Sequence, residues 1–309
     1  MAELSFIEWI RQRVQLDPRV VLGVGDDAAA VRFRTDQPVL ITTDMLLEGS
    51  CFRLAEAGPR LVGRKAMAVN LSDIAAMAGK PVAAVVSVGL PRSATQAIAE
   101  ELFLGMQAIA KEFDTAIVGG DTNSWDGPLV INITLLGEPT GAGPVCRHGA
   151  EPGDWLMVTG PLGGSIQGHH LTFTPRVQEA LYLHEHYRLK AMIDLSDGLA
   201  LDLHRLCRES ECGALLVADA IPLRHSVRTP TDGRSSLEHA LGDGEDFELL
   251  LAVAPGTGQQ LLAEQPLLKS MNVTLYHVGH CQPEGVELQM PDGTIQSLRP
   301  MGYEHTFGD

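Results

Sequence analysis

Asp194-Leu195-Ser196-Asp197-Gly198 joins an apolar segment to a helix that the sequence predicts at about 198–211. The apolar segment therefore delivers two carboxylates to a turn. Four other segments follow the same pattern: Gly23-Val24-Gly25-Asp26-Asp27, Thr42-Thr43-Asp44, Asn70-Leu71-Ser72-Asp73 and Gly119-Gly120-Asp121-Thr122. Carboxylates are the hard oxygen ligands that Mg2+ requires, and neighbouring glycines let backbone N–H groups approach phosphate oxygens closely. Together the five segments predict a site for several magnesium ions and the phosphates of a nucleotide.

Each of these segments has a simpler interpretation when it is taken alone. An aspartate after a strand is commonly a helix cap or a turn former. Asn70 and Asp73 share one face of a predicted helix, where exposure to solvent is the default. Asp26 and Asp27, however, are costly to ionise side by side without a cation. Five such segments, each set among small and apolar residues, favour metal binding over surface chance.

Apolar periodicity predicts alternating helices and strands on both sides of a Gly/Pro-rich stretch at 137–144. Before this stretch we expect a helix at 3–15, a strand at 39–43 ending in Asp44, a helix at 60–79, a strand at 82–88, a helix opened by a Ser93–Gln96 capping box, and strands at 115–118 and 129–136. After it we expect strands at 155–159, 214–218 and 247–253, a Gly-rich turn at 160–165, and helices at 198–211 and 257–269. The pattern predicts two α/β domains, residues 1–145 and 146–309.

Composition excludes several classes of protein. The formal net charge of −16 over 309 residues argues against a nucleic-acid partner, whose backbone would be repelled. The sequence contains no apolar run of the roughly 20 residues that span a bilayer, and its first residues lack a basic signal-peptide region. Its five cysteines, an odd number without CxxC spacing, favour reduced thiols in a cytoplasmic protein.

Familiar catalytic motifs are missing from the sequence. It has no GxxxxGK[ST] phosphate loop, no GxGxxG that opens a helix after a strand, and no GxSxG elbow. Its eleven histidines form neither HExxH nor a Cys/His zinc pattern. The acidic segments therefore carry the functional interpretation.

The ordered set of motifs resembles the thiamine-monophosphate kinase family, within the superfamily that includes aminoimidazole-ribonucleotide synthetase and selenophosphate synthetase. The matching stretches follow the family order across nearly the whole chain: GVGDDAA at 23–29, TTDMLLEG at 42–49, KAMAVNLSDIAAMAG at 65–79, IVGGDT at 117–122, CRHGAEPGDWLMVTG at 146–160, IDLSDGLALDL at 193–203 and GDGEDFELL at 242–250. The resemblance implies an α/β (α+β) fold with two domains of the aminoimidazole-ribonucleotide synthetase type. In each domain helices pack on a mixed sheet.

The resemblance also implies an activity and a set of site residues. The activity is ATP-dependent phosphorylation of thiamine monophosphate to thiamine diphosphate, with several Mg2+ ions, direct transfer and no separate general base. The ions would be surrounded by Asp27, Thr42, Thr43, Asp44, Asp73, Asp121, Asp194 and Asp197, and ATP would be contacted by Gly120, Asp121, Arg147 and Ser196.

Three residues would lie at the substrate: Cys51, Glu245 and Tyr303. Arg147 suits phosphate because a guanidinium pairs with two oxygens, although an interdomain salt bridge is the alternative. Tyr303 would offer an aromatic face to the cationic thiamine rings, and simple packing is its alternative.

Two features depart from the family pattern. Cys51 occupies a position where family members commonly carry a histidine near the substrate, and a thiol cannot supply an imidazole's charge or paired nitrogens. The connection at 164–176 is also shorter than usual and runs almost directly into His169-His170. ATP and magnesium binding are therefore better supported than the identity of the substrate.

Three alternatives stay open at this point. The first is a sister ATP-dependent synthetase, the second a nucleotide-binding member with an altered or lost substrate, and the third a magnesium phosphohydrolase. The absence of a cysteine before Cys51 argues against a selenophosphate synthetase. The resemblance further implies a homodimer that pairs through sheet edges in the N-terminal domain, with no membrane partner.

Overall fold

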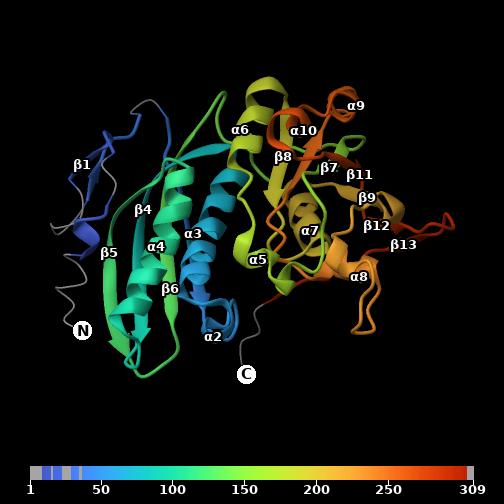
Figure 1. The fold of residues 1–309 in the computed structure, drawn as a ribbon. Helices are drawn as coiled ribbons and strands as arrows, with labels where there is room; N and C mark the ends of the chain where they lie inside the picture. The colour runs from blue at the N-terminus through green and yellow to red at the C-terminus, as the bar shows by residue number, and fades with distance from the viewer. Residues whose placement is uncertain (1–8, 15–16, 23–28, 35–36, 305–309) are drawn as a thin grey trace. The chain divides into compact units, whose positions relative to one another are not determined.

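The computed structural model describes residues 9–14, 17–22, 29–34 and 37–304. The chain forms two compact units. The first comprises the described residues up to Ile74 together with Gly79–Gly143, and the second comprises Ala75–Ala78 and the described residues from Pro144 onward. Each unit contains a mixed sheet with helices packed on it, as expected from the sequence (Figure 1).

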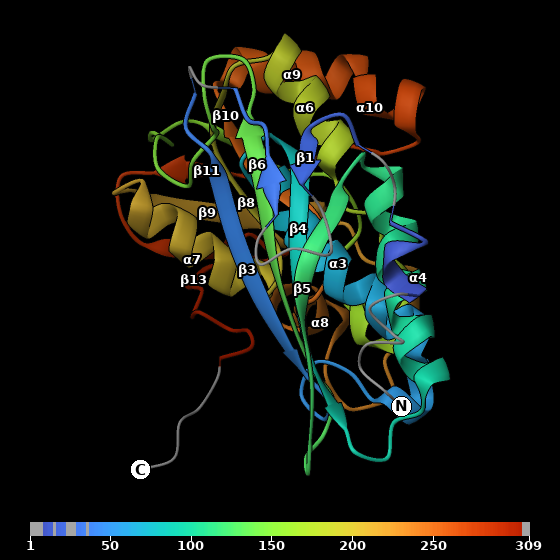
Figure 2. The same cartoon turned by 90° about the vertical axis from the view of Figure 1, so that its left-hand side faces the viewer.

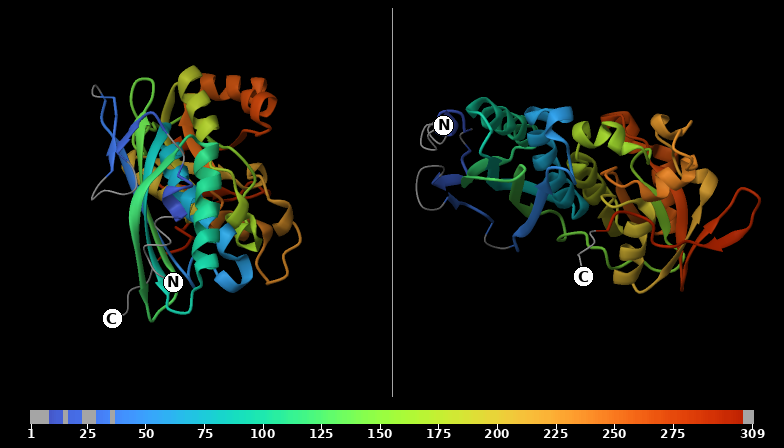
Figure 3. Two further views of the ribbon diagram at one scale, coloured as in Figure 1. Left: turned by 60° about the vertical axis from the view of Figure 1, so that its left-hand side comes forward. Right: turned by 90° about the horizontal axis from the view of Figure 1, so that it is seen from below.

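The first unit is built on a four-stranded sheet of order β3-β6-β4-β5. Its strands are β3 (Leu40–Leu47), β6 (Val130–Pro139), β4 (Gly79–Pro91) and β5 (Ala116–Trp125). Only the β4–β5 pair is parallel. Helices α3 (Pro59–Ala76) and α4 (Gln96–Glu112) cover one face, and a short helix, α2 (Leu54–Ala57), precedes α3 (Figures 1 and 3).

Alternation along the strands makes one face of this sheet apolar and buried. On β6, Ile131, Ile133 and Leu135 are fully buried, whereas Asn132 and Thr134 between them are partly exposed. We call the surface away from α3 and α4 the open face. The short strands β1 (Val20–Leu22) and β2 (Ala30–Val31) lie over one end of it, where residues of both strands pack on Val82, Ala83, Ala116 and Val118 (Figure 2).

The second unit is built on a seven-stranded sheet of order β13-β12-β9-β11-β7-β10-β8. Its strands are β7 (Trp155–Val158), β8 (Leu189–Asp194), β9 (Gly213–Val217), β10 (Leu249–Val253), β11 (Tyr276–Gln282), β12 (Val286–Gln289) and β13 (Ile295–Ser297). Its α-helices are α5 (His169–Thr172), α6 (Val177–His186), α7 (Leu199–Glu209), α8 (Ser236–Gly242), α9 (Pro255–Glu264) and α10 (Pro266–Met271). Short 3-10 turns lie at Ser165–Gln167, Ala218–Ala220 and His225–Val227.

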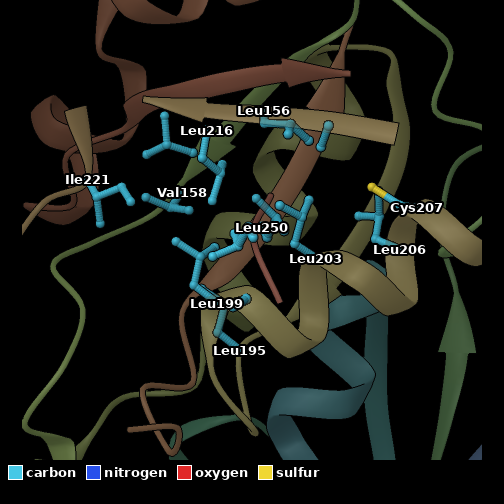
Figure 4. Close-up of a cluster of buried hydrophobic side chains, with 14 of the residues drawn as sticks. Leu156, Val158, Leu195, Leu199, Leu203, Leu206, Cys207, Leu216, Ile221 and Leu250 are labelled. Atoms are coloured by element: carbon cyan, nitrogen blue, oxygen red, sulfur yellow. The ribbon is translucent and has the colours of Figure 1, made fainter. Parts of the chain in front are cut away.

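Helix α7 supplies much of the core of the second unit. Its leucines at 199, 203 and 206 recur at helical spacing and are fully buried against Leu156, Val158, Leu216 and Leu250 of the sheet (Figure 4). Burying a leucine side chain stabilises a fold by about 1.5–3 kcal/mol. This packing holds the N-terminus of α7, and with it the Asp194–Asp197 segment, against the end of the sheet.

Helices α3, α4 and α7 are confirmed, and three other expectations need correction. Strand β3 continues to Leu47, so Asp44 lies within the strand instead of at its end. Thr95, not Ser93, caps α4, since its hydroxyl accepts a hydrogen bond from the backbone N–H of Ile98. The helix expected at 257–269 is two helices, because Gln265 is left-handed and Pro266 begins a new helix. In the described residues no helix is both long and apolar enough to cross a bilayer.

Helices α3 and α4 cross at two glycines. A Cβ added at Gly63 would lie 2.0 Å from the Leu102 carbonyl oxygen, and one added at Gly105 would lie 2.0 Å from the Arg60 carbonyl oxygen. Such contacts are impossible without moving a helix backbone. Glycine at both positions is therefore required for this close approach.

We predict that Gly105→Ala destabilises the first unit by about 2–3 kcal/mol, because the added methyl group overpacks the helix crossing. Gly256→Ala on α9 is the matched control, since a Cβ there meets nothing within 4 Å and alanine is the better helix former. Differential scanning calorimetry should show a lower midpoint for Gly105→Ala only. Equal midpoints for both variants would contradict the prediction.

Candidate functional site

Strand β3 and helix α3 bring three of the predicted magnesium ligands to one side of the first sheet. Thr42 and Asp44 alternate with exposed residues and so point toward the helices, where both are half-buried. The hydroxyl of Thr42 donates a hydrogen bond to Oδ2 of Asp73 on α3. Asp73 is itself half-buried, and Asn70 beside it is fully buried. The expectation that Asn70 and Asp73 are exposed to solvent by default is therefore wrong.

Thr43 and Asp121 belong to the open face instead. Thr43 Oγ1 lies 3.3 Å from Asn132 Oδ1, and the strand register pairs Ser87 with both Asn132 and Asp121. Paired residues in a ladder share a face, so Asp121 and Asp44 are on opposite faces. Gly120 precedes Asp121 at a point where a Cβ would lie 1.9 Å from the Val86 carbonyl oxygen, so only glycine fits there. Asp27 lies outside the described residues.

Cys51 lies in the turn that follows β3. Its backbone carbonyl accepts a hydrogen bond of 2.6 Å from Nζ of Lys65, a residue of α3 that is completely buried. A buried ammonium must be satisfied by hydrogen bonds, so Lys65 ties this turn to the helix. Lys65 was not among the site residues expected from sequence. Its position in the motif KAMAVNLSD was the only signal.

In the second unit the Asp194–Asp197 segment and the turn at 243–248 are joined through their backbones. The N–H of Glu245 donates to the Ser196 carbonyl at 2.7 Å, and the N–H of Phe247 donates to the Leu195 carbonyl at 2.8 Å. Leu195 donates in return to the carbonyl of Glu248 at 2.8 Å. Residues about 50 positions apart in the sequence thus form one structural unit, which we call the acidic junction (Leu195–Asp197 with Glu245–Glu248).

The acidic junction contains strained backbone. Glu245 and Phe247 have φ angles of +55° and +50°, in the left-handed region that non-glycine residues rarely occupy. Such conformations cost on the order of 1–3 kcal/mol each and cluster at functional sites. Asp194 directly precedes the junction and is only 3% exposed. The combination of strain and buried charge distinguishes this turn from an ordinary connection.

Tyr303 lies beside the acidic junction and Arg147 does not. The N–H of Tyr303 donates to the Asp197 carbonyl at 3.0 Å, and half of the Tyr303 side chain is exposed. Arg147 lies exposed in the segment before β7, where its carbonyl accepts a hydrogen bond from Ser210. The structure therefore groups Ser196, Asp197, Glu245 and Tyr303 of the predicted site.

Asp202 and Arg205 on α7 complete this group. Oδ2 of Asp202 accepts hydrogen bonds from the N–H groups of Asp197 at 3.0 Å and Gly198 at 3.2 Å. Arg205 Nη1 donates to Oδ2 of Asp197 at 2.5 Å and to Oδ1 of Asp202 at 2.7 Å. Neither residue was expected from sequence, although an aspartate in the first turn of a helix is a capping signal.

Burial, with smaller contributions from the charges of Asp194 and Asp197, raises the pKa of Asp202 to about 7. Crowded carboxylates of this kind favour a nearby cation. No group of three or more His, Cys, Asp or Glu side chains within residues 9–14, 17–22, 29–34 and 37–304 is arranged to hold a metal ion. Carboxylate and hydroxyl oxygens are donors of the kind that Mg2+ prefers, and the predicted ligands are distributed over both units.

The Gly-rich turn after β7 holds the acidic junction from another side. The N–H of Gly163 donates to both carboxylate oxygens of Asp246, at 3.1 and 3.0 Å, and the N–H of Gly164 donates to Asp243 at 2.7 Å. The hydroxyl of Ser165 donates to the Glu245 carbonyl. These glycine N–H groups therefore bind carboxylates of the same chain.

Comparison with known proteins identifies the family. Residues 25–138 match the model described as AIR synthase related protein, N-terminal domain, and residues 151–289 match the corresponding C-terminal domain. The thiamine-monophosphate kinase of Rhodopirellula baltica is 44% identical over 262 residues, which cover 82% of each chain. The chain belongs to the thiamine-monophosphate kinase family.

Solved structures agree with this family assignment. The thiamine-monophosphate kinase of Stenotrophomonas maltophilia superposes with a TM-score of 0.82 at 30% identity, over 95% of this chain and 97% of its own. AaThiL, solved in complex with AMPPCP and TMP, superposes with a TM-score of 0.77 at 26% identity, over 98% and 97% of the two chains. The resemblance read from the sequence motifs is confirmed.

We predict that His169 makes the protein less stable in acid. Burial, with smaller contributions from the nearby Arg224 and Arg176 cations, lowers its pKa from 6.5 to about 4. Between these values the unfolded chain binds more protons than the folded one. The free energy of unfolding therefore falls, by about 1–2 kcal/mol for this partly buried ring, as pH drops from 6.5 toward 4.

Urea unfolding of wild type and His169→Gln at several pH values measures this effect. The variant should lose less stability than wild type between pH 7 and pH 4.5. His186→Gln, at an exposed position on α6, should behave as wild type. Parallel pH profiles for wild type and His169→Gln would contradict the prediction.

Proposed function

We propose that the protein transfers the γ-phosphoryl group of ATP to thiamine monophosphate and so forms thiamine diphosphate. The observation that carries the proposal is the AaThiL complex, which holds AMPPCP, an ATP analogue, together with TMP and aligns with 98% of this chain. The acidic junction adds support, since it groups residues implied at the nucleotide and at the substrate. A cytoplasmic location remains a prediction.

Magnesium ions are part of this proposal. Thr42, Asp44 and Asp73 would contribute oxygens on the helix side of the first sheet, and Asp194 and Asp197 would contribute oxygens within the second unit. Thr43 and Asp121 lie on the opposite face of the first sheet and so would not share an ion with Asp44. Asp27 completes the expected set. When bound, Mg2+ neutralises phosphate charge and holds the nucleotide's phosphates in place. The charges of Asp194 and Asp197, which add to the effect of burial on the pKa of Asp202, support a cation beside the acidic junction.

The protein's own residues would then position the reactants. Gly120 and Ser196 would approach phosphate oxygens through small or backbone groups, and Arg147 through its guanidinium. The substrate's phosphate oxygen attacks the γ-phosphorus in line, and ADP leaves. A phosphate nucleophile is already ionised at neutral pH, so the step requires no strong general base. Arg205 would hold Asp197 in place through its hydrogen bond.

Because Cys51 departs from the family pattern, one alternative to the proposed function is a family member with an altered phosphoryl acceptor. The carbonyl of Cys51 is bound by Lys65, which anchors the backbone of this turn. The Cys51 thiol stands where the resemblance to the family leads us to expect an imidazole. A sister synthetase or a phosphohydrolase would consume ATP without forming thiamine diphosphate. Product analysis therefore separates these functions.

The central experiment is incubation with ATP, Mg2+ and thiamine monophosphate, followed by chromatography for thiamine diphosphate and ADP. We expect the two products in equal amounts and none after chelation of Mg2+. Asp44→Asn should lower kcat by about 100-fold or more with little change in the midpoint of thermal unfolding, because the amide keeps the shape of the side chain and removes the charge that an ion needs.

Asp292→Asn is the control for Asp44→Asn, since Asp292 lies in an exposed turn and bonds only locally to Thr294. It should retain wild-type turnover. Wild-type kinetics of Asp44→Asn across magnesium concentrations would disprove the role of Asp44. Loss of ATP without thiamine diphosphate would disprove the proposed acceptor.

The proposal includes a homodimer formed through the first unit. Ile41 and Met45 are 68% and 59% exposed on the open face, and both belong to the outer strand β3. Exposed apolar residues in a row on a sheet favour association. A second copy of the same sheet offers a matching surface.

We predict a dimer in sedimentation at micromolar concentration and dissociation to monomer in Ile41→Glu, because a buried unpaired charge opposes association. Ile295→Glu, at an equally apolar exposed position on β13 of the second unit, should remain dimeric. A wild-type protein that sediments as a monomer would disprove this arrangement.

A further inference from the structure

We propose that His170 is a positioning residue that orients the carboxylate of Glu245 toward a cationic group of the substrate. The inference rests on the proposed function and deepens it. Nδ1 of His170 lies 3.0 Å from Oε2 of Glu245, a direct polar contact. The His170 side chain is 8% exposed and that of Glu245 is 27% exposed, so one partner is inside the protein and the other can meet a ligand.

The backbone of Glu245 is already fixed before His170 acts. Its N–H donates to Ser196, its carbonyl accepts from Ser165, and its φ angle of +55° lies in a narrow left-handed region. Only the side-chain torsions of Glu245 are left to set. A glutamate side chain loses up to about 2 kcal/mol of rotamer entropy when it is ordered. The contact with His170 supplies that ordering before a ligand arrives.

His170 reaches Glu245 because of the connection in which this chain departs from the family pattern. Helix α5 begins after Gly168, whose φ of +119° permits a sharp change of direction. At its other end Phe173 stacks on Phe247, with ring centroids 4.2 Å apart and planes 14° apart. Helix α5 is thus attached to the acidic junction at two points. His170 contacts the carboxylate of Glu245, and Phe173 stacks on Phe247, the other residue of the junction with a left-handed backbone.

The charge of the pair suits a cationic ligand. The contact with Nδ1 leaves Glu245 an anion. Thiamine monophosphate carries a permanent positive charge on its thiazolium ring. An oriented, partly exposed carboxylate attracts such a charge more strongly than one free to turn into water. His170 thereby contributes to substrate specificity without touching the substrate.

The test compares His170→Ala and His170→Asn with wild type. An asparagine amide can donate from nearly the same place as Nδ1. We expect KM for thiamine monophosphate to rise about 5- to 20-fold in His170→Ala, with KM for ATP unchanged, and to return near wild type in His170→Asn. His186→Ala, at an exposed histidine on α6, should change neither constant.

A neutral analogue identifies the charge effect. A deaza analogue of thiamine monophosphate, in which carbon replaces the thiazolium nitrogen, should bind wild type and His170→Ala equally in calorimetry. An unchanged KM for thiamine monophosphate in His170→Ala would overturn the proposal. A parallel rise of both KM values with a lower unfolding midpoint would also overturn it, since that pattern marks a purely structural role.

The contact between His170 and Glu245 can be measured independently of the enzymatic activity. If wild type forms no thiamine diphosphate, the proposed function fails, and so does the substrate role of His170. The contact itself is tested by 15N chemical shifts of the His170 ring, which should change in Glu245→Gln and stay the same in Glu264→Gln. No change in Glu245→Gln would show that the contact is absent in solution.

Discussion

The backbone hydrogen bonds of the acidic junction are the constraint on which the second unit's site depends. Strands β8 and β10 pair up to Asp194 and Leu249, and the exchange continues beyond them through Leu195, Ser196 and Glu245. This extension joins residues of the predicted nucleotide and substrate sites without using any of their side chains. Helix α7 stabilises the same loops through its buried leucines and through Asp202.

Donors of the same chain bind the carboxylates around the acidic junction. Arg205 donates hydrogen bonds to Asp197 and Asp202, and the backbone N–H groups of Gly163 and Gly164 donate to Asp246 and Asp243. Asp202, Asp243 and Asp246 thus have donors in the folded state, as buried charges require. Burial raises the pKa of Asp202 to about 7, with a smaller contribution from the charges of Asp194 and Asp197. The magnesium ions of the proposed function would bring positive charge to these carboxylates.

Much of the architecture follows from periodicity. The apolar spacing in α3, α4 and α7 and the alternation in β6 identify the core faces directly, since one face of each element is uniformly apolar. The acidic motifs likewise identify the elements that carry the candidate site. The face occupied by Asp121 could not be predicted, because it depends on the β4–β5 register and on the irregularity between Ala84 and Val85. Contacts of Asp202 and Lys65 depend on tertiary packing, and no local pattern distinguishes them from an ordinary cap or an exposed lysine.

The glycine crossing of α3 and α4 has a mechanical consequence. Sliding one helix past the other by a turn, about 5.4 Å, would bring side chains into a gap that admits only hydrogen atoms. Helix α3, which carries both Lys65 and Asp73, therefore cannot slide past α4 by one turn. Some helical proteins respond to ligands by such a movement. Any adjustment of the first unit to a bound nucleotide must therefore come from segments other than the crossing of α3 and α4.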